Sequence, residues 1–255
     1  RQMCIRDRTV SGSLVTTPSP AVVDTDSDLD NGIIIHEYGH GISTRLTGGP
    51  ANSSCLNNVE QMGEGWSDYF GIVLTMKSTD TPEQLRGVGT YVMGQPTNGG
   101  GIRPAPYTTN RAVNNFTYSD LPNTSISQPH GIGFLWCTML WDMTWKFVDR
   151  YGFDANLKTG TGGNRRALRI VVEGLKLQPC SPGFVDGRDA ILKANQELFG
   201  GDDLDIIWEA FADRGLGYYA SQGSSNNRND GVADFTRPPL CPADAGTLAR
   251  PSNTG

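Results

Sequence analysis

The chain has 255 residues, enough for one large domain or two small ones with a sizeable core. Hydrophobic residues make up 37% of it and the formal net charge is -6, a balance typical of globular proteins. No apolar run is long enough to span a bilayer, and there is no basic stripe to neutralise phosphates. The composition therefore predicts neither a membrane nor a nucleic-acid partner.

The first thirty residues divide into three parts. Residues 1–8 follow no signal-peptide pattern and no fold logic, so we expect a non-native leader there and a native chain that begins upstream. Residues 9–23 are rich in Ser, Thr and Pro and predict an extended or loop segment. Four alternating aspartates follow, which either start a calcium (Ca²⁺) loop, although Asn31 replaces its glycine, or cap the next helix. They are Asp24, Asp26, Asp28 and Asp30.

A helix is predicted over residues 31–45, and Gly48-Gly49-Pro50 ends it. It contains His36 and His40, which are four residues apart and so share one face, where both imidazoles can bind one ion. Glu37 is placed to take a proton from a water molecule on that ion. This HExxH arrangement is typical of zinc metallopeptidases. The alternative is a helix with two incidental histidines.

A second helix is predicted over residues 59–76. A catalytic zinc ion usually has three protein ligands and one water, and with only one other histidine in the chain a carboxylate is the economical third ligand. Glu64 is the candidate, and Glu60, one turn earlier, is its competitor. Asp68, one turn after Glu64, is placed to accept a hydrogen bond from the outer N–H of a zinc-binding histidine.

Residues 87–129 are rich in Gly, Pro and Asn and predict a long excursion, with short β-like pieces such as residues 90–93. A helical C-terminal subdomain is expected from about residue 130, followed by a polar tail over residues 224–255. The catalytic region would then cover residues 9–223. Together the elements predict a mainly α fold with long loops and few short strands. Helical spacing predicts helices over residues 131–151, 165–177, 186–199 and 204–214.

The five cysteines include no CxxC pair, which argues against a thiolate zinc site. They are compatible with one or two disulfides in an oxidising compartment. Cys137 lies in an apolar run and is expected to be a buried free thiol, whereas Cys241 is a candidate tether for the polar tail.

Peptide hydrolysis also needs a hydrogen-bond donor for the tetrahedral oxyanion, besides the metal. His130 is one candidate, because it precedes a long helix as a cleft residue would. Its alternative role is to cap that helix. Tyr107 and Tyr118, both in the excursion, offer a phenol instead, and the sequence does not choose among the three.

These motifs resemble the fungalysin family (M36) of extracellular zinc metallopeptidases, and its bacterial branch most closely. The spacing Glu64-x-x-x-Asp68 after the histidine motif is also the gluzincin pattern, of which thermolysin is the familiar example. The resemblance covers residues 20–241 and departs from the family at Thr44, where an Asn is common, and at residues 201–203, which leaves the disulfide pattern open. It rests on residues 36–43, 45–53, 62–68, 129–133, 136–141, 187–192 and 211–217.

The resemblance implies the helical C-terminal part of a thermolysin-like catalytic unit. It implies one Zn²⁺ per chain, held by the positions matching His36, His40 and Glu64, with Glu37 as general base. It further implies a secreted, extracellular endopeptidase that acts on proteins or peptides and is made with a propeptide. The family's upstream catalytic β-rich segment, which helps to bind the substrate, is missing here.

Two other functions are weighed against this one. One is a gluzincin aminopeptidase, although no exopeptidase amine-binding motif is visible. The other is a non-catalytic, zinc-stabilised or adhesive module derived from a peptidase fold. Glu37 argues against such a module, because a structural zinc has no need of a base and usually has four protein ligands.

Overall fold

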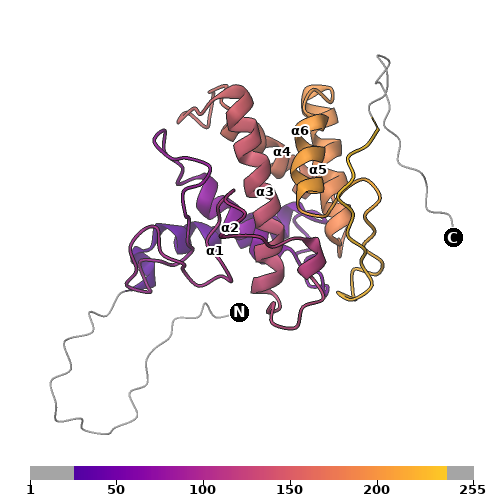
Figure 1. The fold of residues 1–255 in the computed structure, drawn as a ribbon, viewed down its shortest axis with the longest axis horizontal. Coiled ribbons are helices and arrows are strands. Elements are labelled where there is room, and N and C mark those ends of the chain that lie inside the picture. The colour runs from indigo at the N-terminus through magenta and orange to yellow at the C-terminus, as the bar shows by residue number, and fades with distance from the viewer. Residues whose placement is uncertain (1–25, 240–255) are drawn as a thin grey trace, which may run out of the picture.

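The computed structural model describes residues 26–239. Within this range the chain forms helices joined by long loops, and its only β pairings are isolated bridges, so the predicted mainly α fold is confirmed. The predicted leader over residues 1–8 and the candidate tether Cys241 lie outside the described residues. The described residues form six α-helices, which are labelled in Figure 1: α1 (Asn31–Leu46), α2 (Gly63–Val73), α3 (His130–Tyr151), α4 (Gly163–Leu177), α5 (Phe184–Phe199) and α6 (Leu204–Asp213).

Aspartate side chains cap the N-termini of the first two helical segments. Asp30 Oδ1 accepts from the backbone N–H groups of Gly32 and Ile33 at the start of α1, at 2.9 and 3.3 Å. Asp26 caps the 3₁₀-helix η1 (Ser27–Leu29) by accepting from the N–H of Asp28 at 3.0 Å. Each such cap is worth about 1 kcal/mol. These two carboxylates therefore act as helix caps, and Asp24 lies outside the described residues.

Helix α2 is shorter than the predicted helix over residues 59–76. It begins at Gly63 and ends at Val73. The residues before it are held by another part of the chain, because the N–H of Glu60 donates to the carbonyl oxygen of Ser225 at 3.0 Å. A tertiary contact from a distant loop thus replaces the first helical turn.

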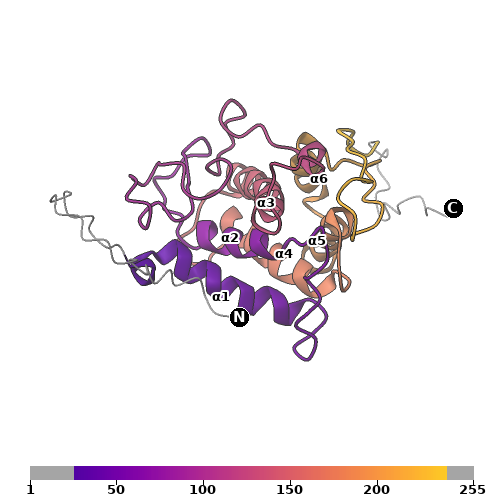
Figure 2. The same cartoon turned by 90° about the horizontal axis from the view of Figure 1, so that it is seen from below.

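Helices α1, α2 and α3 are stacked, with α2 in the middle (Figure 2). Glycines permit this close approach. A Cβ atom on Gly39 of α1 would lie 2.8 Å from the Cα atom of Ser67 in α2. A Cβ atom on Gly65 of α2 would lie 2.2 Å from the carbonyl oxygen of Gly133 in α3. Larger side chains at these crossings would push apart the helices that carry the predicted site residues.

The core lies around α3, whose residues from Gly131 to Trp145 are all buried. Trp136 sits at its centre and has edge-on contacts with Trp66 of α2 and Phe184 of α5. Burying an aromatic or aliphatic side chain of this size contributes about 1.5–3 kcal/mol. The α2–α3 interface is therefore a stable base for whatever α2 presents on its other side.

The excursion over residues 87–129 contains turns and the 3₁₀-helix η2 (Tyr118–Asp120), and its one β-bridge to the chain before it joins Tyr107 to Arg86. The prediction of a β-like piece at residues 90–93 was wrong. These residues form turns, because Gly89 and Gly94 on either side adopt φ of 71° and 62°, which reverse the chain.

One disulfide joins Cys55 to Cys180 across 125 residues of sequence, and it ties the loop after α1 to the loop before α5. A link over so long a loop contributes typically about 2–4 kcal/mol. Cys137 is a buried free cysteine, as predicted. The polar segment after Gly223 is bonded to the body, because Arg228 donates to three backbone carbonyl oxygens within residues 121–126 at 2.6–2.9 Å. In the described range, no helix combines the length and the apolar character that crossing a membrane requires.

Candidate metal centre

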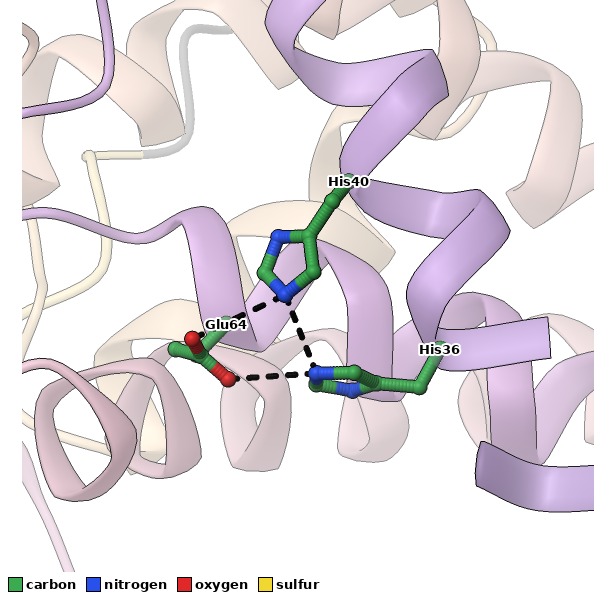
Figure 3. A group of neighbouring side chains, drawn as sticks. All are labelled: His36, His40 and Glu64. Carbon is green, nitrogen blue, oxygen red and sulfur yellow. Dashed lines mark hydrogen bonds and ion pairs between the residues drawn. The ribbon is translucent and has the colours of Figure 1, made fainter. Parts of the chain in front are cut away.

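Three side chains from α1 and α2 meet at one point (Figure 3). The Nε2 atoms of His36 and His40 lie 3.1 Å apart. The carboxylate of Glu64, in the first turn of α2, lies 3.1 Å from Nε2 of His36 and 3.6 Å from Nε2 of His40. Among residues 26–239, this is the only group of three or more His, Cys, Asp or Glu side chains whose ligand atoms lie close enough to share a metal ion.

The separations and the donor atoms both fit zinc. Ligands about 2.0–2.1 Å from a tetrahedral zinc ion lie about 3.3 Å from one another. The three distances in the cluster, 3.1, 3.1 and 3.6 Å, bracket that value. Two imidazoles and one carboxylate are also the ligands of catalytic zinc sites that keep a fourth position open.

Asp68 orients one of the two histidines. Its Oδ1 lies 2.7 Å from Nδ1 of His36, and its side chain is fully buried. Burial alone would raise the pKa of Asp68, but hydrogen bonds from Arg103 and His36 hold it well below its usual range. An ionised carboxylate can only accept, so Nδ1 of His36 carries a proton, and Nε2 is the ring nitrogen that faces Glu64 and the centre of the cluster.

The charges around the cluster favour a cation. Burial lowers the pKa of His36, but hydrogen bonds to Asp68 and Glu64 outweigh it and raise the pKa to about 9. The pKa of His40 is lowered, first by burial and then by repulsion from His36. The two carboxylates that raise the pKa of His36 favour positive charge where the three side chains meet, and a bound metal ion would supply that charge in place of the His36 proton.

Sequence reasoning missed Arg103. Its guanidinium donates to both oxygens of Asp68, through Nε at 2.7 Å and Nη2 at 2.8 Å, and Nη2 also lies 3.5 Å from Oε2 of Glu64. Tyr107 donates its hydroxyl to the same Asp68 carboxylate. Both residues come from the excursion, 35 and 39 residues after Asp68, and no spacing rule connects them to it. The one signal available was Asp68 itself, because a carboxylate that is buried next to a metal site needs a cationic partner.

The structure places the three candidate oxyanion donors in different surroundings. His130 is the first residue of α3, and its exposed ring has Nε2 3.6 Å from Oε2 of Glu64. The N-cap position of α3 is Pro129, and the N–H of Gly131 donates to Oγ of Ser127 at 3.1 Å, so the capping alternative for His130 is not observed. Tyr107 is occupied by Asp68. Tyr118 is buried elsewhere, with its hydroxyl 3.4 Å from the carbonyl oxygen of Ser221. Only His130 lies beside the cluster.

Glu37 follows His36 on α1 and is exposed to solvent. Its negative charge is near enough to oppose the lowering of the pKa of His40. A carboxylate beside the cluster that ligates nothing is available for proton transfer, which is what a general base requires.

Glu60, the competing third ligand, lies away from the histidines. Its side chain is fully buried, with Oε2 accepting from the backbone N–H of Phe184 at 3.2 Å and Oε1 without a hydrogen-bond partner. Burial raises the pKa of Glu60 to about 8, and the negative charges of Asp230 and Asp186 act in the same direction. Its surroundings stabilise a neutral carboxyl at the start of α5, and a metal ligand is normally ionised.

The Glu60→Gln variant should therefore have a different pH dependence of stability. The folded protein keeps the Glu60 proton up to about pH 8, whereas the unfolded chain releases it near pH 4.5. This contribution to stability is fully present below pH 4.5 and is lost as pH rises to about 8, by up to about 1.4 kcal/mol per pH unit. Denaturant unfolding of both proteins between pH 4 and 9 should give free energies that diverge in favour of the variant as pH rises. Parallel curves would contradict the prediction.

The chain is similar in sequence to known extracellular metalloproteinases. Residues 16–220 match the model of a family described as fungalysin metallopeptidase (M36). The chain is 40% identical over 222 residues to Extracellular metalloproteinase 2 of Arthroderma gypseum, across 84% of this chain and 34% of that protein. It is 44% identical over 211 residues to Extracellular metalloproteinase MEP of Neosartorya fischeri, across 80% of this chain and 32% of that protein. The chain thus spans about a third of the length of the curated relatives it matches.

Proposed function

Because the chain belongs to the fungalysin (M36) metallopeptidase family, we propose that it carries the zinc site of an endopeptidase that hydrolyses peptide bonds in proteins. The observation that carries the proposal is the cluster of His36, His40 and Glu64, whose spacing fits one zinc ion. Helix α1 supplies two ligands and the neighbouring Glu37, and α2 supplies the third. A purely structural zinc would need neither an adjacent base nor an open fourth position.

Zinc bound there would supply Lewis acidity, which lowers the pKa of water and polarises a carbonyl group. Glu37 accepts the proton of the attacking water and delivers it to the leaving amine. His130 donates a hydrogen bond to the oxyanion from the start of α3. Asp68 holds His36 in the tautomer that presents Nε2 to the metal. The roles of these residues are proposals that rest on their positions.

We further propose that the protein is secreted and acts outside the cell on protein or peptide substrates, because the relatives are named extracellular metalloproteinases. The region shared with them is about a third of their length. Following the family resemblance, we propose a propeptide and an upstream catalytic segment as partners that complete the cleft. The closer likeness to a bacterial branch, expected from the motifs, stays a prediction.

Chelation tests the proposal. In the full-length, processed protein, cleavage of casein should be lost on removal of metal with 1,10-phenanthroline and should return when stoichiometric zinc is added. Endoproteolysis generates internal fragments, whereas an aminopeptidase releases free amino acids one at a time. Mass spectrometry of the products therefore separates these two activities. Bound zinc without any turnover would instead favour a non-catalytic module and would contradict the proposal.

A further inference from the structure

Arg103 connects the two carboxylates of the metal centre. Its guanidinium donates to Asp68 through Nε and Nη2 and extends Nη2 toward Oε2 of Glu64, 3.5 Å away. Asp68 in turn accepts from His36, and Nε2 of His36 lies 3.1 Å from the same Glu64 oxygen. The four side chains thus form a closed ring that contains two of the three ligands.

This ring reaches from the excursion into the helical layer. His36 belongs to α1 and both carboxylates to α2, whereas Arg103 lies in irregular chain 35 residues beyond Asp68. The Arg103 side chain is only 5% exposed, so its interactions with both carboxylates are shielded from solvent. A buried two-point contact of a guanidinium with a carboxylate fixes the orientation of both planes.

We propose that Arg103 is a positioning residue for metal binding, which sets the directions in which Glu64 and, through Asp68, His36 present their donor atoms. The inference rests on the proposed function, since it takes these side chains to be zinc ligands. The positive charge of Arg103 would repel a Zn²⁺ ion. Because its guanidinium is paired with the ionised carboxylate of Asp68, the pair has no net charge and most of this repulsion is cancelled. Without Arg103, Asp68 is a buried carboxylate that has lost its cation, an unfavourable state that the network relieves by rearranging.

Arg86 provides a matched control, because it is another largely buried arginine that pairs with an aspartate, in the stretch of chain that leads into the excursion. Its guanidinium donates to Asp80 at 2.8 Å and to Thr75, and its backbone forms the bridge with Tyr107. It touches neither Glu64 nor Asp68 in any described contact. The Arg86→Met substitution therefore removes side-chain contacts with Asp80 and Thr75, keeps the backbone bridge with Tyr107, and removes no contact to the carboxylates of the centre.

The test compares Arg103→Met with Arg86→Met in the 255-residue chain, by competition for Zn²⁺ against a chromogenic chelator, with thermal unfolding measured alongside. Arg103→Met should weaken zinc binding by about 10–100-fold, the range typical of residues that support metal ligands. Arg103→Lys should give an intermediate loss, because lysine keeps the charge but not the planar fork. Arg86→Met should lower the thermal midpoint and leave the zinc dissociation constant unchanged.

Unchanged zinc binding in Arg103→Met would overturn the inference, and so would an equal loss in Arg86→Met, which would trace the effect to the loss of any buried arginine pair rather than to the contacts of Arg103. If Arg103→Met does not fold, Arg103→Lys decides: affinity equal to that of the unaltered chain rejects the positioning role. The proposed function fails separately, if the unaltered chain binds no zinc or if His40→Ala binds zinc as tightly as the unaltered chain.

Discussion

Replacing Glu37 by Gln is expected to lower kcat for peptide hydrolysis by about 10²–10⁴-fold, the contribution usual for a positioned general base. Glutamine has the same shape but cannot accept the proton of the attacking water. The side chain is exposed and ligates nothing in the described cluster, so fold and zinc content should be unchanged. The measurement is the steady-state rate on a quenched fluorescent peptide, with zinc per chain determined on the same sample of processed, full-length protein.

Glu197→Gln provides the matched control for this variant. Glu197 is a solvent-accessible glutamate on α5 whose nearest described partner is Lys193, at 3.7 Å. The same substitution there removes one negative charge without touching the metal centre, so full activity is expected. Unchanged activity in Glu37→Gln would reject the proton-transfer mechanism. Loss of zinc together with activity would assign Glu37 to metal binding.

Local spacing rules were sufficient to predict each half of the candidate cluster. His36 and His40 share a helix face four residues apart, and the same rule relates Glu64 to Asp68. Helix α1 runs from Asn31 to Leu46, one residue beyond the predicted end. The crossing that brings α1 and α2 together was not predicted. It depends on Gly39 facing the backbone of Ser67, a contact that no single helix pattern contains.

Three further features could not be predicted, because each depends on chain segments that are distant in sequence. Helix α2 starts only at Gly63, because the N–H of Glu60 donates to the carbonyl oxygen of Ser225. These two residues are more than 160 positions apart in the sequence, beyond the reach of any local pattern. The carbonyl groups that hold Arg228 lie in the excursion. Arg103 lies in an excursion without periodicity, so neither a helix rule nor a strand rule places it beside Asp68.

Replacing Glu64, the candidate third ligand, is expected to have a large effect on zinc binding. Glu64→Gln should weaken zinc binding by more than about 100-fold, beyond the range for residues that only support ligands, because it replaces a charged metal ligand by a neutral amide. Peptide hydrolysis should be lost with the metal. Zinc dissociation constants from chelator competition and zinc per chain after dialysis measure the effect.

Glu60→Gln is the matched comparison, since it makes the same chemical change one helical turn earlier in the sequence. Glu60 is buried against the start of α5, and its raised pKa keeps it neutral near pH 7, where glutamine can still accept from the N–H of Phe184. Zinc affinity should therefore be retained in this variant. If Glu60→Gln loses zinc and Glu64→Gln keeps it, the assignment of the third ligand is reversed. Equal retention in both would mean that neither carboxylate ligates the metal, and the His36 and His40 pair would need a ligand from elsewhere in the protein.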